Sequence, residues 1–96
     1  MIRIHPGAEV SSEAEIGDGT MIWRNAQIRE QARMGRKCIV GQSAYIDFGV
    51  IIGDNVKIQN NASLYHGLVL EDGVFVGPHV VFTNDRVPRA VNPEVR

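Results

Sequence analysis

The sequence predicts an all-β solenoid, in which short parallel strands wind into stacked coils. Every sixth residue from Ile4 to Phe82 is apolar, at fourteen successive positions without a shift of frame. A period of six fits neither an amphipathic helix, which repeats every 3.6 residues, nor a half-buried strand, which repeats every two. Each six residues therefore form one short strand and one corner, and successive coils stack on one another.

Each apolar position of this series marks one expected strand, and the residue four places later fills the turn that follows. The series is Ile4, Val10, Ile16, Ile22, Ile28, Met34, Val40, Ile46, Ile52, Ile58, Leu64, Leu70, Val76 and Phe82. Most residues four places later are small or β-branched, such as Ala8 and Val50, which suits a tight turn with little space inside. Cys38 belongs to this row, and we expect it to be a small buried side chain rather than a nucleophile.

The corners between the expected strands sort into three kinds when the hexads are grouped by threes. One kind, at residues 17–19, 35–37, 53–55 and 71–73, is rich in Gly, Asp and Asn, which tolerate positive φ and form tight turns. This sorting predicts 18 residues per coil and about four coils in the chain. Strands of neighbouring coils then lie about 4.8 Å apart.

A second kind of corner carries polar residues that recur once per coil. Its column at 18-residue spacing is Asn25, Ser43, Asn61 and His79. We expect this column to be structural, with hydrogen bonds from coil to coil, although an imidazole can also act as a base. Trp23 opens one of these corners, where an exposed tryptophan favours packing against another subunit. Asn60 lies on the same kind of corner, and we expect it to face an interface and to contact substrate.

Composition and charge exclude several classes of function. Lys and Arg number 10 against 11 for Asp and Glu, for a net charge of −1, which argues against a nucleic-acid or anionic-membrane surface. A single cysteine forms no internal disulfide, and the chain start lacks the apolar region of a signal peptide. No stretch is long enough to span a membrane. The sequence therefore predicts a cytoplasmic protein.

The repeat ends at Phe82, and the residues beyond it are of a different kind. Residues 84–96 are polar and contain prolines at positions 88 and 93, so they read as an excursion from the coil. We therefore divide the chain into β-helix coils at 1–83 and an excursion loop at 84–96. A solenoid that stops on such a loop leaves its last coil with an open apolar core. We therefore expect residues 84–96 to be a truncated substrate loop.

The hexads and their corners resemble the hexapeptide-repeat acyltransferases, whose fold is a left-handed parallel β-helix. Four segments are similar to the bacterial nucleotide-sugar 3-N-acetyltransferases in particular. They are Ile-His-Pro-Gly-Ala at 4–8, Ile-Gly-Asp-Asn-Val-Lys-Ile-Gln-Asn-Asn at 52–61, Val-Phe-Val-Gly-Pro at 74–78, and Val-Phe-Thr-Asn-Asp at 81–85 followed by Pro-Arg-Ala at 88–90. The resemblance covers the whole chain but only the N-terminal half of such an enzyme.

This resemblance implies both an activity and an assembly. The implied reaction moves an acetyl group from acetyl-CoA, with no metal, to the amino group of a UDP- or dTDP-linked 3-amino sugar. The product would enter lipopolysaccharide or another surface glycan. The resemblance implies a homotrimer with active sites between its β-helices, and it assigns the contact with the sugar amino group to Asn84.

The 18-residue register independently predicts a polar site on the third kind of corner. Asn84 follows His66 by 18 residues, Asp85 follows Gly67, and Thr83 follows Tyr65. The expected substrate site is therefore the column of Tyr65, His66, Thr83, Asn84 and Asp85. The alternative is a solvated corner whose side chains only satisfy turn hydrogen bonds.

Two arginines follow this column in the excursion loop. Arg86 and Arg89 can bind a pyrophosphate bidentately, or they can be charges that face solvent.

Two other classes of function stay open at this point. Some hexapeptide β-helices are carbonic anhydrases that bind zinc or iron through three histidines, and this chain has three, at His5, His66 and His79. Their spacing is against a shared metal, since His5 lies in the first coil and the other two lie on different corners. The third class is a non-enzymatic β-helix that serves as a scaffold or an oligomerisation module.

Overall fold

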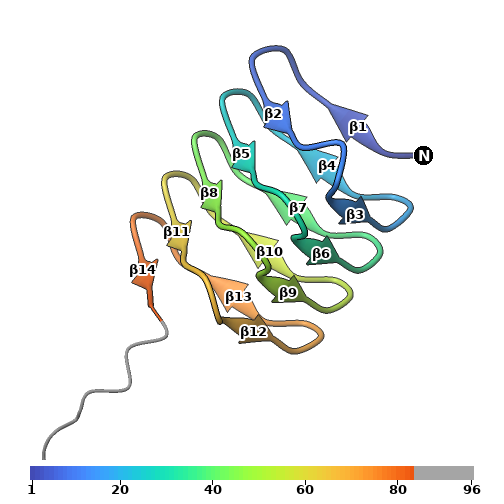
Figure 1. Ribbon diagram of the computed structural model, residues 1–96. Helices are drawn as coiled ribbons and strands as arrows, with labels where there is room; N and C mark the ends of the chain where they lie inside the picture. Colours follow the sequence, from blue (N-terminus) through green and yellow to red (C-terminus); the bar gives the residue numbers. More distant parts are fainter. Residues whose placement is uncertain (84–96) are drawn as a thin grey trace, which may run out of the picture.

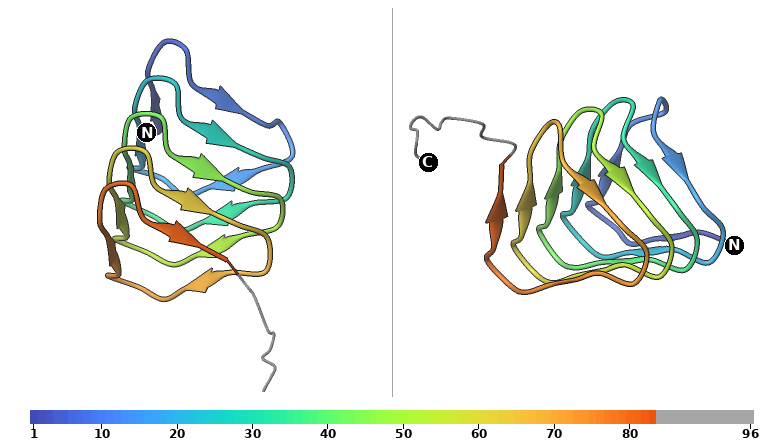
Figure 2. Two further views of the ribbon diagram at one scale, coloured as in Figure 1. Left: turned by 90° about the vertical axis from the view of Figure 1, so that its left-hand side faces the viewer. Right: turned by 90° about the horizontal axis from the view of Figure 1, so that it is seen from below.

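The computed structural model describes residues 1–83, which form a single β-solenoid (Figure 1). Within this range the chain contains fourteen strands of two residues each and no helix. The strands follow one another every six residues, as the apolar series predicted. They lie on three faces, so that each coil has three strands and three corners (Figure 2).

The strands form three parallel sheets, each running along the length of the solenoid. Sheet A contains β1 (Arg3–Ile4), β4 (Met21–Ile22), β7 (Ile39–Val40), β10 (Lys57–Ile58) and β13 (Phe75–Val76). Sheet B contains β2 (Glu9–Val10), β5 (Gln27–Ile28), β8 (Tyr45–Ile46), β11 (Ser63–Leu64) and β14 (Val81–Phe82). Sheet C contains β3 (Glu15–Ile16), β6 (Arg33–Met34), β9 (Ile51–Ile52) and β12 (Val69–Leu70). The described residues therefore make four full coils and two strands of a fifth.

The register between coils is 18 residues throughout. Ile4 pairs with Ile22 in sheet A, and Leu64 pairs with Phe82 in sheet B, in each case with parallel strands. This confirms the predicted 18-residue coil. The architecture agrees with the left-handed parallel β-helix that the resemblance implied.

The core is a column of apolar side chains along the solenoid axis. The second residue of each strand points inward, and those of the middle coils, such as Ile22, Ile46 and Leu64, are fully buried. Complete burial of such a side chain stabilises the fold by about 1.5–3 kcal/mol. At the two ends of the described coils, Ile4 and Phe82 remain 52% and 37% exposed because only one neighbouring coil covers each of them.

The turn residues inside the corners also pack into this core. Ala26, Ala44 and Cys38 are buried, and the Cys38 Sγ lies 3.2 Å from the carbonyl oxygen of Gly53. Desolvation raises the pKa of the Cys38 thiol, which keeps it protonated. The interpretation of Cys38 as a small buried side chain is therefore confirmed.

The corners hold successive coils together by main-chain hydrogen bonds. The column of Asn25, Ser43, Asn61 and His79 adopts positive φ, and the N–H of Ser43, Asn61 and His79 each donates to a carbonyl oxygen one coil earlier. The bonds from coil to coil at this column come from the main chain. Side-chain bonds between coils arise one position earlier, where Asn60 Oδ1 accepts the N–H of Gln42 at 2.8 Å.

Candidate functional site

The candidate site lies on the corner that joins sheet B to sheet C, which we call the B–C corner and define as residues 29–32, 47–50 and 65–68. Tyr65 and His66 follow β11 on this corner, and both side chains are exposed. The N–H of Tyr65 donates to the carbonyl oxygen of Phe82 at 2.9 Å, which places Thr83 one coil beyond Tyr65. The structure therefore brings together three of the predicted site residues, Tyr65, His66 and Thr83.

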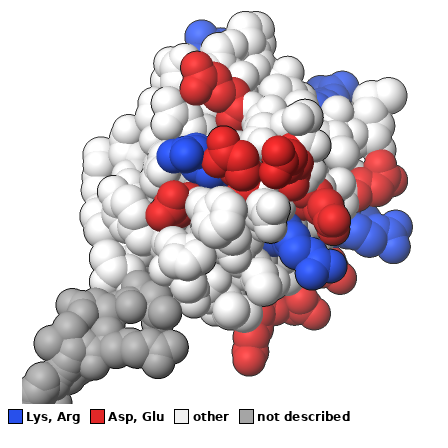
Figure 3. Space-filling model, viewed as in Figure 1, with Lys and Arg blue, Asp and Glu red and all other residues white. Residues whose placement is uncertain are grey.

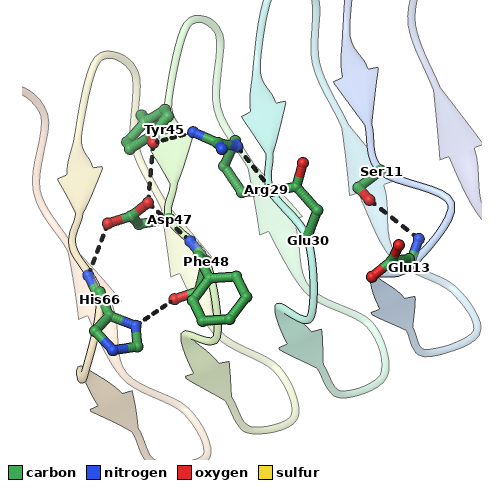
Figure 4. A network of polar contacts seen from close by, with 8 residues as sticks. All are labelled: Ser11, Glu13, Arg29, Glu30, Tyr45, Asp47, Phe48 and His66. Atoms are coloured by element: carbon green, nitrogen blue, oxygen red, sulfur yellow. Dashed lines mark hydrogen bonds and ion pairs between the residues drawn. The ribbon is translucent and has the colours of Figure 1, made fainter.

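A network of polar contacts connects three coils across the B–C corner (Figure 4). Arg29 Nη1 donates to the Tyr45 hydroxyl at 3.0 Å, and this hydroxyl donates to Asp47 Oδ1 at 3.0 Å. The same oxygen accepts the N–H of Phe48 at 2.8 Å, and Asp47 Oδ2 accepts the N–H of His66 at 3.0 Å. One half-buried carboxylate thus takes three hydrogen bonds from two coils.

The electrostatics of the network keep Asp47 ionised. Partial desolvation alone would raise the pKa of this carboxyl. The net effect is nevertheless a pKa below the usual value, because the carboxylate accepts hydrogen bonds from the N–H groups of Phe48 and His66 and from the Tyr45 hydroxyl, and Arg29 adds a nearby positive charge. Desolvation and the neighbouring Asp47 raise the pKa of Tyr45, so its hydroxyl stays protonated as a donor. The corner therefore holds a fixed negative charge next to His66.

Aromatic rings cover the outer side of this corner. The imidazole of His66 lies 5.3 Å from the ring of Phe48 between centroids, and Tyr45 lies 5.7 Å from Tyr65. Phe48 and Tyr65 are 44% and 40% exposed. Half-exposed rings beside hydrogen-bonding groups are suited to contact with a flat polar ligand.

The remaining predicted site residues lie elsewhere in the chain. Asn60 sits on the corner between sheets A and B, at a shallow groove lined with Trp23, Gln42 and Gln59, and within one chain it does not join the B–C corner. Four predicted residues fall outside the described residues: Asn84, Asp85, Arg86 and Arg89.

Reasoning from the sequence missed four members of the network, namely Arg29, Tyr45, Asp47 and Phe48. The signal was present in the register, because residues 18 apart lie side by side on neighbouring coils. Subtracting 18 from Tyr65 and His66 gives Asp47 and Phe48. Tyr45 was harder to find, because its outward position on β8 usually holds a solvated side chain.

The three histidines occupy three separate environments. His5 stacks on Trp23, with ring centroids 4.3 Å apart and planes 8° from parallel. His66 belongs to the B–C corner, and His79 lies at positive φ on the corner between sheets A and B. Within residues 1–83, no group of three or more His, Cys, Asp or Glu side chains is placed to hold a metal ion.

Comparison with known proteins identifies the repeats. Residues 49–84 match the family described as "Bacterial transferase hexapeptide (six repeats)", and residues 31–66 match the family described as "Hexapeptide repeat of succinyl-transferase". The chain belongs to the hexapeptide-repeat superfamily. Both descriptions name transferases, and the second match contains most of the B–C corner network of this hexapeptide-repeat chain.

One curated relative of this hexapeptide-repeat chain bears a different name. It is the "Probable carbonic anhydrase" of Methanocaldococcus jannaschii, which is 35% identical over 86 residues that cover 79% of this chain and 52% of the relative. The chain therefore spans about half the length of the curated relative it matches. The described residues of the hexapeptide-repeat chain contain no helix long and apolar enough to cross a membrane.

Proposed function

We propose that this chain is an acetyl-CoA-dependent N-acetyltransferase, or the N-terminal half of one, that acts on the amino group of a nucleotide-linked 3-amino sugar for surface-glycan synthesis in the cytoplasm. The observation that carries the proposal is the polar B–C corner, where Tyr65 and His66 lie next to the ionised Asp47 and Thr83 follows one coil beyond Tyr65. The match to hexapeptide transferase repeats supports an acyl transfer at this corner.

The chemistry asks little of the protein beyond positioning. The neutral amine attacks the thioester carbonyl, the C–S bond breaks as the amide bond forms, and the amine proton passes to the thiolate of CoA. Orientation of the two reactants and donors for the developing oxyanion supply most of the rate enhancement. In this proposal Asn84 contacts the sugar amino group, Asp85 and Thr83 bind the sugar, and Arg86 and Arg89 bind the pyrophosphate.

The outer surface supports assembly into the proposed homotrimer. Outward strand residues of the first coil are charged, as at Glu9 and Glu15, whereas those of the last three described strands are apolar. Val69, Phe75 and Val81 are each 60–64% exposed. The three side chains lie on three different sheets, and each is a candidate point of contact with another copy of the chain. On the face drawn in Figure 3, by contrast, acidic and basic side chains are interspersed without a large region of one sign.

The first test is thiol release from acetyl-CoA by this 96-residue chain with UDP- and dTDP-linked 3-amino sugars. We expect release in the wild type and its loss in Asn84→Ala, with Gln27→Ala, an exposed residue on sheet B, as the matched control. Release that persists in Asn84→Ala would contradict the assigned role. A folded protein that releases no thiol would favour the scaffold reading instead.

A carbonic anhydrase is the second candidate, because the Methanocaldococcus relative carries that name. The separation of His5, His66 and His79 in one chain is against it, since a catalytic zinc needs three protein ligands around one ion. Metal analysis of the purified protein and CO₂ hydration assays decide between the two. Stoichiometric zinc or iron with hydration activity would replace the acetyltransferase proposal.

A further inference from the structure

The carbonyl oxygen of Phe48 determines which nitrogen of His66 carries a proton. His66 Nδ1 lies 2.8 Å from this oxygen. A carbonyl oxygen only accepts hydrogen bonds, so Nδ1 must be the donor in this contact. In the neutral imidazole the other nitrogen, Nε2, then has a lone pair and acts as an acceptor. Among residues 1–83, Nε2 has no hydrogen-bond partner, and the ring is exposed.

Asp47 accepts a main-chain hydrogen bond from each of the two residues of this contact. Its Oδ1 accepts the N–H of Phe48 at 2.8 Å, which orients the peptide unit ahead of the Phe48 carbonyl. Its Oδ2 accepts the N–H of His66 at 3.0 Å from the next coil, which sets the main chain from which the ring extends. Asp47 thus holds the main chain of both residues (Figure 4), and the Gly49 N–H, which donates to the Glu30 carbonyl oxygen at 3.1 Å, also holds the peptide unit that contains the Phe48 carbonyl.

We propose that the Asp47–Phe48 turn locks His66 as the Nδ1–H tautomer, so that Nε2 accepts a hydrogen bond from the amino group of the substrate. Asp47 is then a positioning residue, and His66 orients the amine for attack on the thioester. This inference rests on the proposed acetyltransferase function. It also restricts the ligand, because the group that binds Nε2 must be an N–H or O–H donor.

Ring ¹⁵N NMR of His66 tests the tautomer without any need for activity. At a pH where the ring is neutral, the wild type should show a protonated Nδ1 and an unprotonated Nε2. In Asp47→Ala the tautomer should shift toward Nε2–H, because the main chain of both Phe48 and His66 loses the hydrogen bond that aligns the ring with the carbonyl. An Nε2–H tautomer in the wild type, or an unchanged tautomer in Asp47→Ala, would overturn the inference.

Two further variants keep this test independent of folding. Asp47→Asn retains one oxygen for Phe48 and Tyr45 but turns an amide N–H toward the N–H of His66, so it should disturb the tautomer while the coils stay intact. Asp72→Asn is the matched control, because Asp72 Oδ1 also accepts a main-chain N–H one coil away, from Asp54 at 2.7 Å, but on a different corner. The control should leave the His66 spectrum unchanged.

Substrate addition tests the acceptor role and separates this inference from the proposed function. Saturating UDP-linked 3-amino sugar should shift the Nε2 resonance of His66, and Asp47→Asn should lower kcat about ten- to a hundredfold with a smaller change in KM. Thiol release without any Nε2 shift would overturn the inference and leave the acetyltransferase standing. Neither thiol release nor an Nε2 shift would overturn both.

Discussion

At the scale of single residues, the Asp47 carboxylate is the group on which most of the candidate site depends. It accepts hydrogen bonds from Tyr45, Phe48 and His66, and its pKa is lowered relative to its usual value despite the opposing effect of desolvation. A carboxyl with a lowered folded-state pKa stabilises the fold fully above its unfolded value of about 3.9, and loses that contribution as the pH falls through the folded value.

The first prediction follows from the lowered pKa of Asp47. At pH 7, Asp47→Asn should lower the free energy of unfolding by about 1–2 kcal/mol, because the N–H of His66 then faces an amide donor. The difference between wild type and variant should shrink below pH 4, where the wild-type carboxyl becomes protonated. Urea unfolding at a series of pH values measures it, and Asp72→Asn, which keeps its single hydrogen bond, should cost less. A pH-independent difference would contradict the assignment.

The Cys38 thiol gives a second prediction at this scale. It has no exposed surface, and burial raises its pKa, so both access and thiolate fraction are low. In the native protein at pH 8, a thiol reagent should label Cys38 only as fast as the protein opens, and at once in denaturant. The variant Gln27→Cys should show one additional thiol that reacts rapidly. Rapid labelling of Cys38 in the folded wild type would show that the coils around it are not closed.

At the scale of the elements, the corners limit which residues fit because successive coils stack directly on one another. A Cβ at Gly35 would clash with Asp54 Oδ1 and lie 2.7 Å from the carbonyl carbon of Gly53 on the next coil. Among the described residues, a Cβ at Gly77 would meet only Val80 Cγ2, at 3.7 Å. Neither glycine has positive φ, so the two positions differ in space and not in conformation.

This contrast makes a third prediction. Gly35→Ala should destabilise the fold by about 1–3 kcal/mol, because the corner must open to admit the methyl group. Gly77→Ala should change the free energy of unfolding far less, and it is the matched control because it stands at the same position of its hexad. Thermal or urea unfolding of the three proteins decides the matter. Equal costs at both glycines would show that stacking of the corners is not what limits the residue at position 35.

The elements also show what the sequence could predict. The period of six and the offset of 18 locate every strand and every register pair, because each strand places its second residue in the core, as at Ile22 and Leu64. Those rules concern inward side chains, whose environment repeats from coil to coil. The contacts of Asp47 and Tyr45 were not predictable in the same way. An outward side chain can face solvent or contact a neighbouring coil, and its rotamer, which the repeat does not determine, decides between the two.

At the scale of the whole molecule, the solenoid changes character along its axis. The outward residues of the first coil are charged, as at Glu15, which pairs with Arg33 through Arg33 Nε at 3.4 Å. The outward residues of the last three described strands, Val69, Phe75 and Val81, are apolar and exposed, one on each sheet. Solenoid coils contact only their neighbours, so these outward side chains stay mostly exposed within residues 1–83. In the proposed trimer a second copy of this chain covers Phe75.

The last prediction tests this assembly. In sedimentation velocity, the wild type should sediment as a trimer, and Phe75→Glu should shift it toward monomer, because burying an unpaired charge costs more than the interface gains from a single side chain. Arg3→Glu is the matched control, since Arg3 occupies the same outward position of sheet A in the first coil, on the polar part of the surface. Because Phe75 points away from the core, the variant should keep its β-sheet circular dichroism. A wild type that sediments as a monomer would leave the B–C corner open to solvent on every side, and the nucleotide sugar would then have to bind within a single chain.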